Sequence, residues 1–210
     1  MSNIPPLLTN LQYVQNWVKE RISPNRFIHS VGVAQTARKL AQQFSDNKAL
    51  QYEAELAGWL HDACKEIKDK ELVEMAKEYG MQLHKIEEEN GHLLHGPVAA
   101  LFVSRTFGLE DQKILDAIAE HTLGAINMTL LSKIVFLADA IEPGRPGDYA
   151  DPIREPIKGE TKNDPKALDR AILVACESSL KFLEENKKVI HPKTIEVRDY
   201  YFRICQQTNC

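Results

Sequence analysis

The spacing of apolar residues constrains the fold of this chain more than any other feature. Apolar side chains recur every three or four residues through most of the sequence, as in the first segment with Leu7, Leu11, Val14 and Val18. This spacing places them on one face of an α-helix, whereas no stretch alternates apolar and polar residues between turn signals as a strand would. The pattern therefore predicts an all-α protein, a bundle of amphipathic helices.

The breaks between these periodic segments predict one domain. We expect a single unit over residues 1–210, with a core at about 25–142, a long loop at 143–164 and C-terminal helices at 165–205. The loop is expected because residues 143–164 hold several prolines and glycines, and a loop of this length in a compact domain is usually functional or mobile. The highly charged stretch 85–91 is expected to be exposed.

Charge and cysteine content argue against several classes of protein. The 26 Lys and Arg and the 30 Asp and Glu give a formal charge of -4, without a basic block. This balance disfavours nucleic acid as the partner but leaves a small anionic ligand open. No apolar run approaches the roughly 20 residues that span a bilayer, and no export signal is visible, so we expect a cytoplasmic protein without a membrane partner. The four separated cysteines predict reduced thiols.

Six polar residues interrupt the apolar segments and point to a metal site. Asp139 is the clearest, because it lies in the apolar run 134–141, where a buried carboxylate needs a cation or hydrogen-bond donors. Imidazoles and carboxylates that face a bundle core from separate helices can bind metal ions. The candidate metal ligands are His29, His61, Asp62, His95, His121 and Asp139.

Each of these residues also has an ordinary structural explanation. A single buried histidine is usually a hydrogen-bonded core residue, and Asp139 could simply pair with Lys133. We favour the metal site because chance would have to place all six side chains at core-facing positions, each with its own partner. Imidazoles and carboxylates without thiolates suit iron, manganese, cobalt or zinc. Six ligands exceed one tetrahedral site, so two divalent metal ions fit better than one.

The order of these residues resembles the HD superfamily of metal-dependent phosphohydrolases, and His95 and His121 resemble the additional ligands of its two-metal members. Four phrases are more closely similar to the YqeK family, bacterial enzymes that cleave diadenosine tetraphosphate symmetrically to two ADP. These phrases are Leu60–Lys65, Leu93–Val98, Glu120–Gly124 and Leu137–Arg145. The similarity covers roughly residues 25–201, and the chain departs from the family in the charged insert before His95 and in the loop after Arg145.

The resemblance implies an HD-domain helical bundle with its metal site in the core and iron as the expected metal. It implies that Asp62 bridges two ions, one of which also takes His29, His61 and Asp139, while the other takes His95 and His121. The implied activity is hydrolysis of diadenosine tetraphosphate to two ADP by a water activated by the metals, with Asp62 and Lys65 as catalytic residues.

His92 and His95 are three residues apart and could share a helix face, so the choice between them rests on the matched phrase. That phrase contains His95, and we expect His84, His92 and His191 to be exposed.

Three cations and one hydroxyl are candidates for substrate binding. Lys65 follows His61 by one helical turn, and Arg26 precedes His29 by nearly one turn, so these cations would project toward the ligands. Surface salt bridges would explain the cations equally simply, and the threonine could cap the next helix. Glu142 follows Asp139 by nearly one turn and could orient a ligand. The candidate substrate contacts are Arg26, Lys65, Thr122 and Arg145.

Two further functions remain open on the sequence. The chain could be a broader nucleotide phosphohydrolase or phosphodiesterase that acts on mononucleotides or cyclic nucleotides. It could also be a catalytically silent nucleotide sensor, although retention of all six proposed ligands disfavours this. The expected partner is a dinucleoside polyphosphate or another small nucleotide, and oligomerisation is left open.

Overall fold

The structure, a computed structural model, describes residues 4–164 and 166–207. Over these residues the chain forms helices and turns without a β-strand, so the all-α prediction is confirmed. In chain order the helices are η1 (Pro6–Thr9), α1 (Leu11–Lys19), α2 (Pro24–Phe44), α3 (Lys48–Leu60), α4 (Asp69–Glu78), α5 (Lys85–Glu89), η2 (Gly91–Leu94), α6 (His95–Phe107), α7 (Gln112–Glu120), α8 (Leu130–Ile141), α9 (Gly147–Arg154), η3 (Glu155–Ile157), α10 (Lys166–Glu185) and α11 (Pro192–Gln206).

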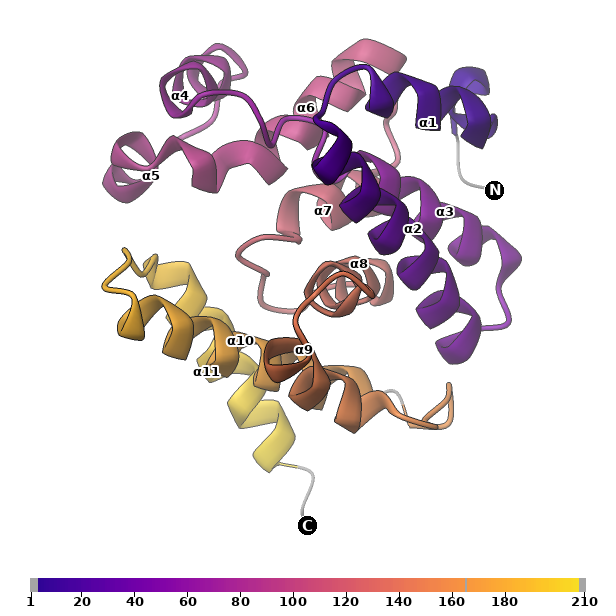
Figure 1. Cartoon of the computed structure of the whole chain (residues 1–210), viewed down its shortest axis with the longest axis vertical. Helices are drawn as coiled ribbons and strands as arrows, with labels where there is room; N and C mark the ends of the chain where they lie inside the picture. The colour runs from indigo at the N-terminus through magenta and orange to yellow at the C-terminus, as the bar shows by residue number, and fades with distance from the viewer. Residues whose placement is uncertain (1–3, 165, 208–210) are drawn as a thin grey trace.

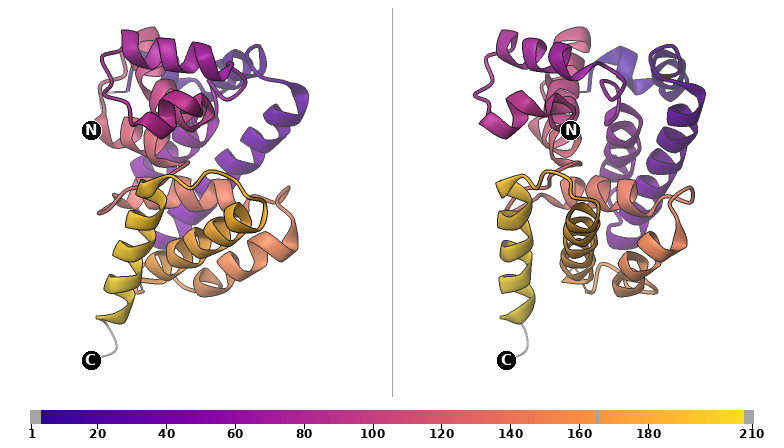
Figure 2. Two further views of the ribbon diagram at one scale, coloured as in Figure 1. Left: turned by 90° about the vertical axis from the view of Figure 1, so that its left-hand side faces the viewer. Right: turned by 60° about the vertical axis from the view of Figure 1, so that its left-hand side comes forward.

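Helix α8 lies near the middle of the molecule, with α2 and α3 on one side and α9, α10 and α11 below it (Figure 1). Two further views show α10 and α11 together on the side away from α1 and α4 (Figure 2). Within the described residues, no helix has the length and apolar character needed to cross a membrane.

Polar residues and glycine set the ends of the central helices. Ser23 accepts a hydrogen bond from the Arg26 backbone at the start of α2, and Thr129 accepts one from Ser132 at the start of α8. These side chains satisfy backbone donors that have no partner within the first turn of a helix. Gly108 ends α6 with a φ of 70°, a left-handed conformation that glycine adopts without steric cost.

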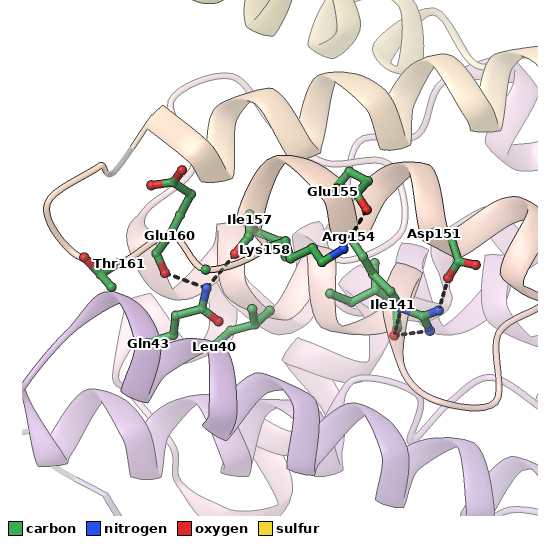
Figure 3. Close-up of a pocket in the computed structure, with 11 residues that line it drawn as sticks. Leu40, Gln43, Ile141, Asp151, Arg154, Glu155, Ile157, Lys158, Glu160 and Thr161 are labelled. Atoms are coloured by element: carbon green, nitrogen blue, oxygen red, sulfur yellow. Dashed lines mark hydrogen bonds and ion pairs between the residues drawn. The ribbon is translucent and has the colours of Figure 1, made fainter.

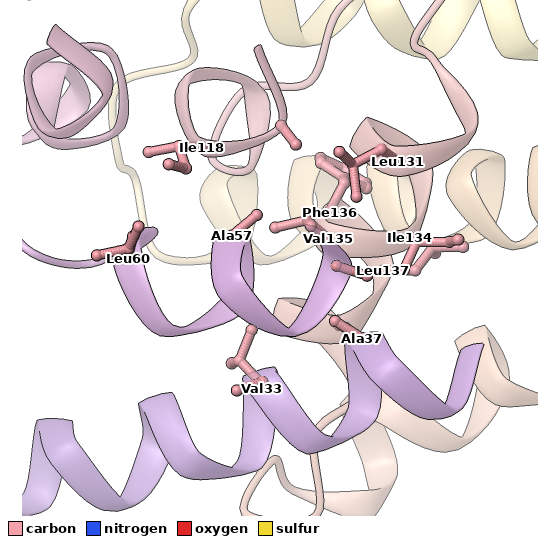
Figure 4. Packing of buried hydrophobic residues seen from close by; sticks show 14 of the residues in the cluster. Val33, Ala37, Ala57, Leu60, Ile118, Leu131, Ile134, Val135, Phe136 and Leu137 are labelled. Carbon is pink, nitrogen blue, oxygen red and sulfur yellow. The ribbon is translucent and has the colours of Figure 1, made fainter. Parts of the chain in front are cut away.

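The apolar core is built around α8. Its side chains Ile134 and Leu137 are fully buried and pack against α2, α3 and α7, as Figure 4 shows. The helices α2 and α3 approach closely at Gly58, where a Cβ atom would lie 2.7 Å from Ala34 Cα. Any side chain there would force the two backbones apart. This close crossing brings the C-terminal end of α3 beside the first turns of α2.

The segment 143–164 differs from its prediction as one long loop, because it contains α9 and η3. The apolar residues Ala150, Ile153 and Ile157 are buried and hold the segment against the core. Burial of apolar side chains outweighs the local effect of prolines and glycines here. Figure 3 shows α9 held through Arg154, which donates to the Ile141 carbonyl at 2.8 Å.

Two smaller expectations also change. The charged stretch 85–91 includes the short helix α5, whose backbone is capped by His84, and its side chains are partly exposed. The sequence predicts an exposed His191, but this residue is buried and caps α11 by accepting a hydrogen bond from the Lys193 backbone. The ring of His191 lies against that of His84, with 5.2 Å between their centroids, and its Nε2 lies 3.7 Å from Glu87 Oε1, so its burial reflects contacts with the segment around α5.

Candidate metal centre

The six predicted metal ligands converge on one cluster where the ends of several helices meet. Four of them are buried, namely His61, Asp62, His95 and His121. His29 comes from the second turn of α2 and Asp139 from the last turn of α8, and both are partly buried. Residues far apart in the sequence therefore place four imidazoles and two carboxylates together in the described structure.

Three of the imidazoles are anchored in the same way, at the ends of helices. His61, His95 and His121 occupy the C-cap positions of α3, η2 and α7. The Nδ1 atom of each lies 2.6 to 2.7 Å from the carbonyl oxygen three residues earlier. Such carbonyls are free because the last turn of a helix leaves them without an intrahelical partner. A carbonyl only accepts, so Nδ1 carries a proton, and in the neutral tautomer Nε2 then presents a lone pair.

The fourth imidazole, His29, is anchored by a carboxylate. Its Nδ1 lies 3.1 Å from Glu142 Oε1, and the second carboxylate oxygen of Glu142 accepts from the Gly144 backbone at 2.6 Å. Glu142 is buried, and the space for its carboxylate depends on Gly32, where a Cβ would lie 2.4 Å from Oε2. Glu142 thus fixes the proton of His29 on Nδ1 and leaves the Nε2 lone pair facing the cluster.

The two oxygens of Asp62 face different groups of ligands. Oδ1 lies 3.3 Å from His95 Nε2 and 3.5 Å from His121 Nε2. Oδ2 lies 3.4 Å from His61 Nε2 and 3.7 Å from His29 Nε2. Asp62 therefore stands between the two groups, the position that the sequence predicts for a bridging carboxylate.

Asp139 joins the group around Oδ2. Its Oδ1 lies 3.0 Å from His29 Nε2, and its ligand atom lies within 4.8 Å of those of both His29 and His61. The three residues together form one triplet of donors, and His61, Asp62 and His121 form a second triplet.

The donor atoms fit divalent metal ions. Two ligand atoms about 2.1 Å from one ion and at right angles to each other lie about 3.0 Å apart. His95 Nε2 and His121 Nε2 are separated by 3.0 Å, a distance at which two lone pairs repel unless positive charge lies beside them. His29 Nε2 and His61 Nε2 are buried and make no hydrogen bond to the described part of the chain. Unpaired buried acceptors of this kind are what a metal ion satisfies.

The charge states of the cluster also suit metal binding. Burial works against the charge of Asp62, but the neighbouring imidazoles, His61 foremost, hold the pKa of its carboxyl well below the usual value. Burial likewise opposes the charge of Asp139, yet His29 and Arg145 hold its pKa far below the ordinary range. Burial lowers the pKa of His95 to about 4. At neutral pH the carboxylates are therefore ionised and His95 is neutral, the states in which they bind metals.

The three predicted substrate-binding cations contact the cluster directly. Arg26 lies 3.0 Å from Asp62 Oδ2, and Arg145 lies 2.5 Å from Asp139 Oδ1. The Nζ atom of Lys65 lies 3.2 Å from His95 Nε2, and burial lowers the pKa of its ammonium group. The cations thus form ion pairs or close contacts with candidate ligands instead of surface salt bridges.

The side chains of Lys133 and His92 have partners of their own outside the cluster. Lys133 does not pair with Asp139, because its ammonium group lies 2.5 Å from Asp169. His92 is an exposed residue whose ring pairs with Asp69, and only its carbonyl contacts His95. Neither side chain therefore takes part in the candidate metal centre.

Thr122 lies inside the cluster. Its Oγ1 is 3.0 Å from both His95 Nε2 and His121 Nε2, while Thr129 caps the next helix. The hydroxyl can donate to only one of the two nitrogens at a time, so it cannot satisfy both lone pairs.

A cavity of about 320 Å³, named here the phosphate cavity, opens beside the cluster. It is lined by Ser23, Asn25, Arg26, His29, Glu66, Glu142, Gly144, Arg145 and Pro146. Two arginines and a candidate metal ligand therefore face one opening together with two carboxylates, Glu66 and Glu142. An anion that enters the cavity can pair with the guanidinium groups beside the cluster.

Comparison with known proteins agrees with this geometry. Residues 26–144 match the HD domain family. The chain is 32% identical over 192 residues to a protein of Staphylococcus aureus named symmetrical bis(5'-nucleosyl)-tetraphosphatase, covering 91% of this chain and 94% of that protein. It is 34% identical over 178 residues to a Bacillus subtilis protein of the same name, covering 84% and 89%.

A solved structure is also similar. It is the crystal structure of a predicted HD superfamily hydrolase involved in NAD metabolism from Clostridium acetobutylicum, with a TM-score of 0.82 and 29% identity over 92% of this chain and 97% of that one. The matched fold, the matched region around the cluster and the relatives together establish that this chain belongs to the HD domain family, within its group of symmetrical bis(5'-nucleosyl)-tetraphosphatases.

Proposed function

We propose that the chain hydrolyses diadenosine tetraphosphate to two ADP with the help of two divalent metal ions. The observation that carries the proposal is the position of Asp62, whose two oxygens face two groups of unprotonated imidazole nitrogens beside a cavity with two arginines. The names of the curated relatives support the substrate and the symmetrical cleavage.

Each candidate ligand has a defined role in this proposal. His29, His61 and Asp139 would hold one ion, His95 and His121 the second, and Asp62 both. When bound, divalent ions supply charge neutralisation at phosphoryl oxygens and a water nucleophile at neutral pH. The chain's own contribution is to hold the four Nδ1–H groups on their anchors, so that every Nε2 faces the cluster.

The cations supply the binding of phosphate. In the described structure Arg26 pairs with Asp62 and Arg145 with Asp139, while Lys65 contacts His95. Divalent ions bound to the two carboxylates would release both guanidinium groups for the phosphates of the substrate. We assign Arg26 and Arg145 to phosphate binding, because both line the phosphate cavity.

Lys65 and Thr122 complete the assignment. Lys65 reaches His95 from within the cluster and would stabilise charge on the transferred phosphoryl group. The Thr122 hydroxyl lies between two ligand nitrogens and would contact the substrate beside them. The reaction joins the water oxygen to one of the two central phosphorus atoms and breaks its bond to the central bridging oxygen. That oxygen leaves with the second ADP.

Iron as the metal and the cytoplasm as the location belong to the same proposal. The imidazole and carboxylate donors also accept manganese, cobalt and zinc, so the metal that is available decides which ion is bound.

One experiment tests the function and separates it from a broader phosphohydrolase and from a sensor. The protein is purified without oxygen, its metal content is measured, and the products from diadenosine tetraphosphate are separated by chromatography. Two ADP support the proposal, and AMP with ATP contradicts the position of cleavage. Preferred turnover of mononucleotides or cyclic nucleotides would show a broader phosphohydrolase. Binding of the substrate without turnover, whichever of the four metals is supplied, would show a nucleotide sensor.

A further inference from the structure

A second cavity, of about 530 Å³ and named here the side cavity, lies against the metal cluster. Its walls include Leu93 before α6, Thr122 after α7, Arg145 and Tyr149 around the start of α9, and Phe182 near the end of α10. Two of these residues also contact candidate ligands: Thr122 contacts His95 and His121, and Arg145 contacts Asp139. The side cavity therefore opens directly onto the groups assigned to the reaction.

The side cavity and the phosphate cavity have different linings. They share Arg145 and Pro146, so they lie on either side of one short segment. The phosphate cavity is lined by polar residues, glycine and proline around Arg26 and His29. The side cavity instead presents leucines and two aromatic rings, those of Tyr149 and Phe182. A ligand that spans both would place its charged part in one and a flat apolar part in the second.

The aromatic walls suit a nucleobase. A volume of 530 Å³ lies within the roughly 300–1,000 Å³ of small-molecule sites, which combine apolar walls with a few polar groups. The Tyr149 hydroxyl lies 3.4 Å from Ser179 Oγ, so polar atoms line the same wall as the ring. Phe182 has 55% of its surface exposed, so its ring is open to contact from a ligand in the cavity. Aromatic side chains stack well on base faces.

We propose that the side cavity binds one nucleoside of the substrate, with its base against Phe182 and Tyr149. This assignment rests on the proposed function, because it takes the polyphosphate chain past Arg145 to the metal cluster. Among the described residues, the lining of the phosphate cavity contains no Phe, Tyr or Trp, and its one ring, that of His29, belongs to a candidate metal ligand. The two nucleosides of a symmetrical substrate are therefore held unequally: one stacks in the side cavity, and its twin is held through its phosphates.

A third cavity is a weaker candidate. It measures about 880 Å³ and lies between α2 and α9, as Figure 3 shows. Charged side chains of its lining pair with one another, Arg154 with Asp151 at 2.6 Å and Lys158 with Glu155 at 3.1 Å. None of its lining residues is a candidate metal ligand, so this cavity offers the reacting phosphates no contact with the cluster.

The test compares Phe182→Ala with Phe202→Ala. Both phenylalanines are exposed near the C-terminal side of the molecule, but Phe202 does not line the side cavity. Calorimetry on the metal-loaded protein measures the Kd of ADP and of inorganic pyrophosphate, which has phosphates but no base. We expect Phe182→Ala to weaken ADP by about 5- to 150-fold, the loss of one stacking contact, without changing pyrophosphate. Phe202→Ala should change neither, and Phe182→Tyr should retain ADP affinity.

The outcomes separate this inference from the function on which it rests. If the wild-type protein makes two ADP but Phe182→Ala binds ADP as well as Phe202→Ala does, the nucleoside assignment is wrong and the function stands. Equal weakening of ADP and pyrophosphate by Phe182→Ala would also overturn it, because the effect would then not involve the base. Selective weakening of ADP in a protein that does not cleave diadenosine tetraphosphate would support the nucleoside site and contradict the function.

Discussion

The substitution Glu142→Gln tests whether the anchoring of His29 matters for metal binding. The Glu142 carboxylate accepts from His29 Nδ1 at 3.1 Å and from the Gly144 backbone at 2.6 Å. A glutamine has nearly the same volume and so fits the space beside Gly32, but it has only one oxygen. Its NH2 group must then face one of the two N–H donors, and either arrangement loses an accepted hydrogen bond.

The size of the effect follows from that lost bond. A hydrogen bond to a charged group contributes about 1.5–3 kcal/mol, and loss of a residue that orients a metal ligand costs about 10- to 100-fold in metal affinity or activity. The two ranges agree, because tenfold corresponds to about 1.4 kcal/mol. We therefore expect Glu142→Gln to bind one ion about 10- to 100-fold more weakly and to lose a similar factor in kcat, while the apo protein stays folded.

The assay is competition with a chelator of known affinity, combined with the metal content after anaerobic purification. Glu55→Gln is the matched control, because Glu55 on α3 also pairs with a side chain of α2, Arg38, at 2.5 Å, and does not contact the cluster. Thermal unfolding of both apo variants checks that each is folded. Equal metal affinities for Glu142→Gln and Glu55→Gln would refute the assigned role of Glu142.

Three more perturbations give distinct results. His95→Ala should remove one of the two ions, whereas His92→Ala should retain both, because His95 directs its Nε2 at Asp62 and His92 pairs with Asp69. Elemental analysis of both variants measures this, and the reverse result would overturn the assignment. Lys65→Met should lower kcat at least tenfold with the metal content unchanged, and loss of metal instead would make Lys65 a structural residue. The pKa of His95 is lowered to about 4, so between about pH 6.5 and 4 this histidine binds a proton in the unfolded chain but not in the folded one. The urea midpoint of the metal-free protein should therefore fall between pH 6.5 and 4, and a rise would contradict this sign.

Much of the fold is readable from the sequence because burial follows helical periodicity. Gly108, for example, ends α6 in the left-handed conformation that is common for glycine at a helix end. The unpredicted helix α9 shows the limit of local signals. Its Gly147 and Pro152 favour a loop, whereas Ile153, with Ile157 of the following η3, gains more by burial than those residues cost. Such a balance depends on a surface that only the folded core supplies.

Some residues of the site can likewise be predicted from the sequence, and others cannot. Asp139 stands out in the sequence because a carboxylate in an apolar run needs a partner, and the structure supplies His29 and Arg145. The position of Thr122 between two imidazoles is harder to predict from the sequence, because a threonine after a helix usually caps the next helix. The aromatic wall formed by Tyr149 and Phe182 cannot be seen in the sequence at all, since these residues come from separate helices.

The anchoring of the histidines ties the metal site to the lengths of the helices. An imidazole in an apolar bundle must satisfy two nitrogens, and the free carbonyls at a helix end satisfy Nδ1 without a second side chain. His61 and His121 use this solution at the ends of α3 and α7, so their Nε2 atoms point beyond the helices to the place where these ends meet. A one-residue insertion in α3 ahead of Gly58 would turn the end of the helix by about 100°, so His61 would keep its anchor but its Nε2 would no longer point to this place. The residues that end the helices are therefore also the residues that form the site, and the positions of these ends are under a functional constraint as well as a structural one.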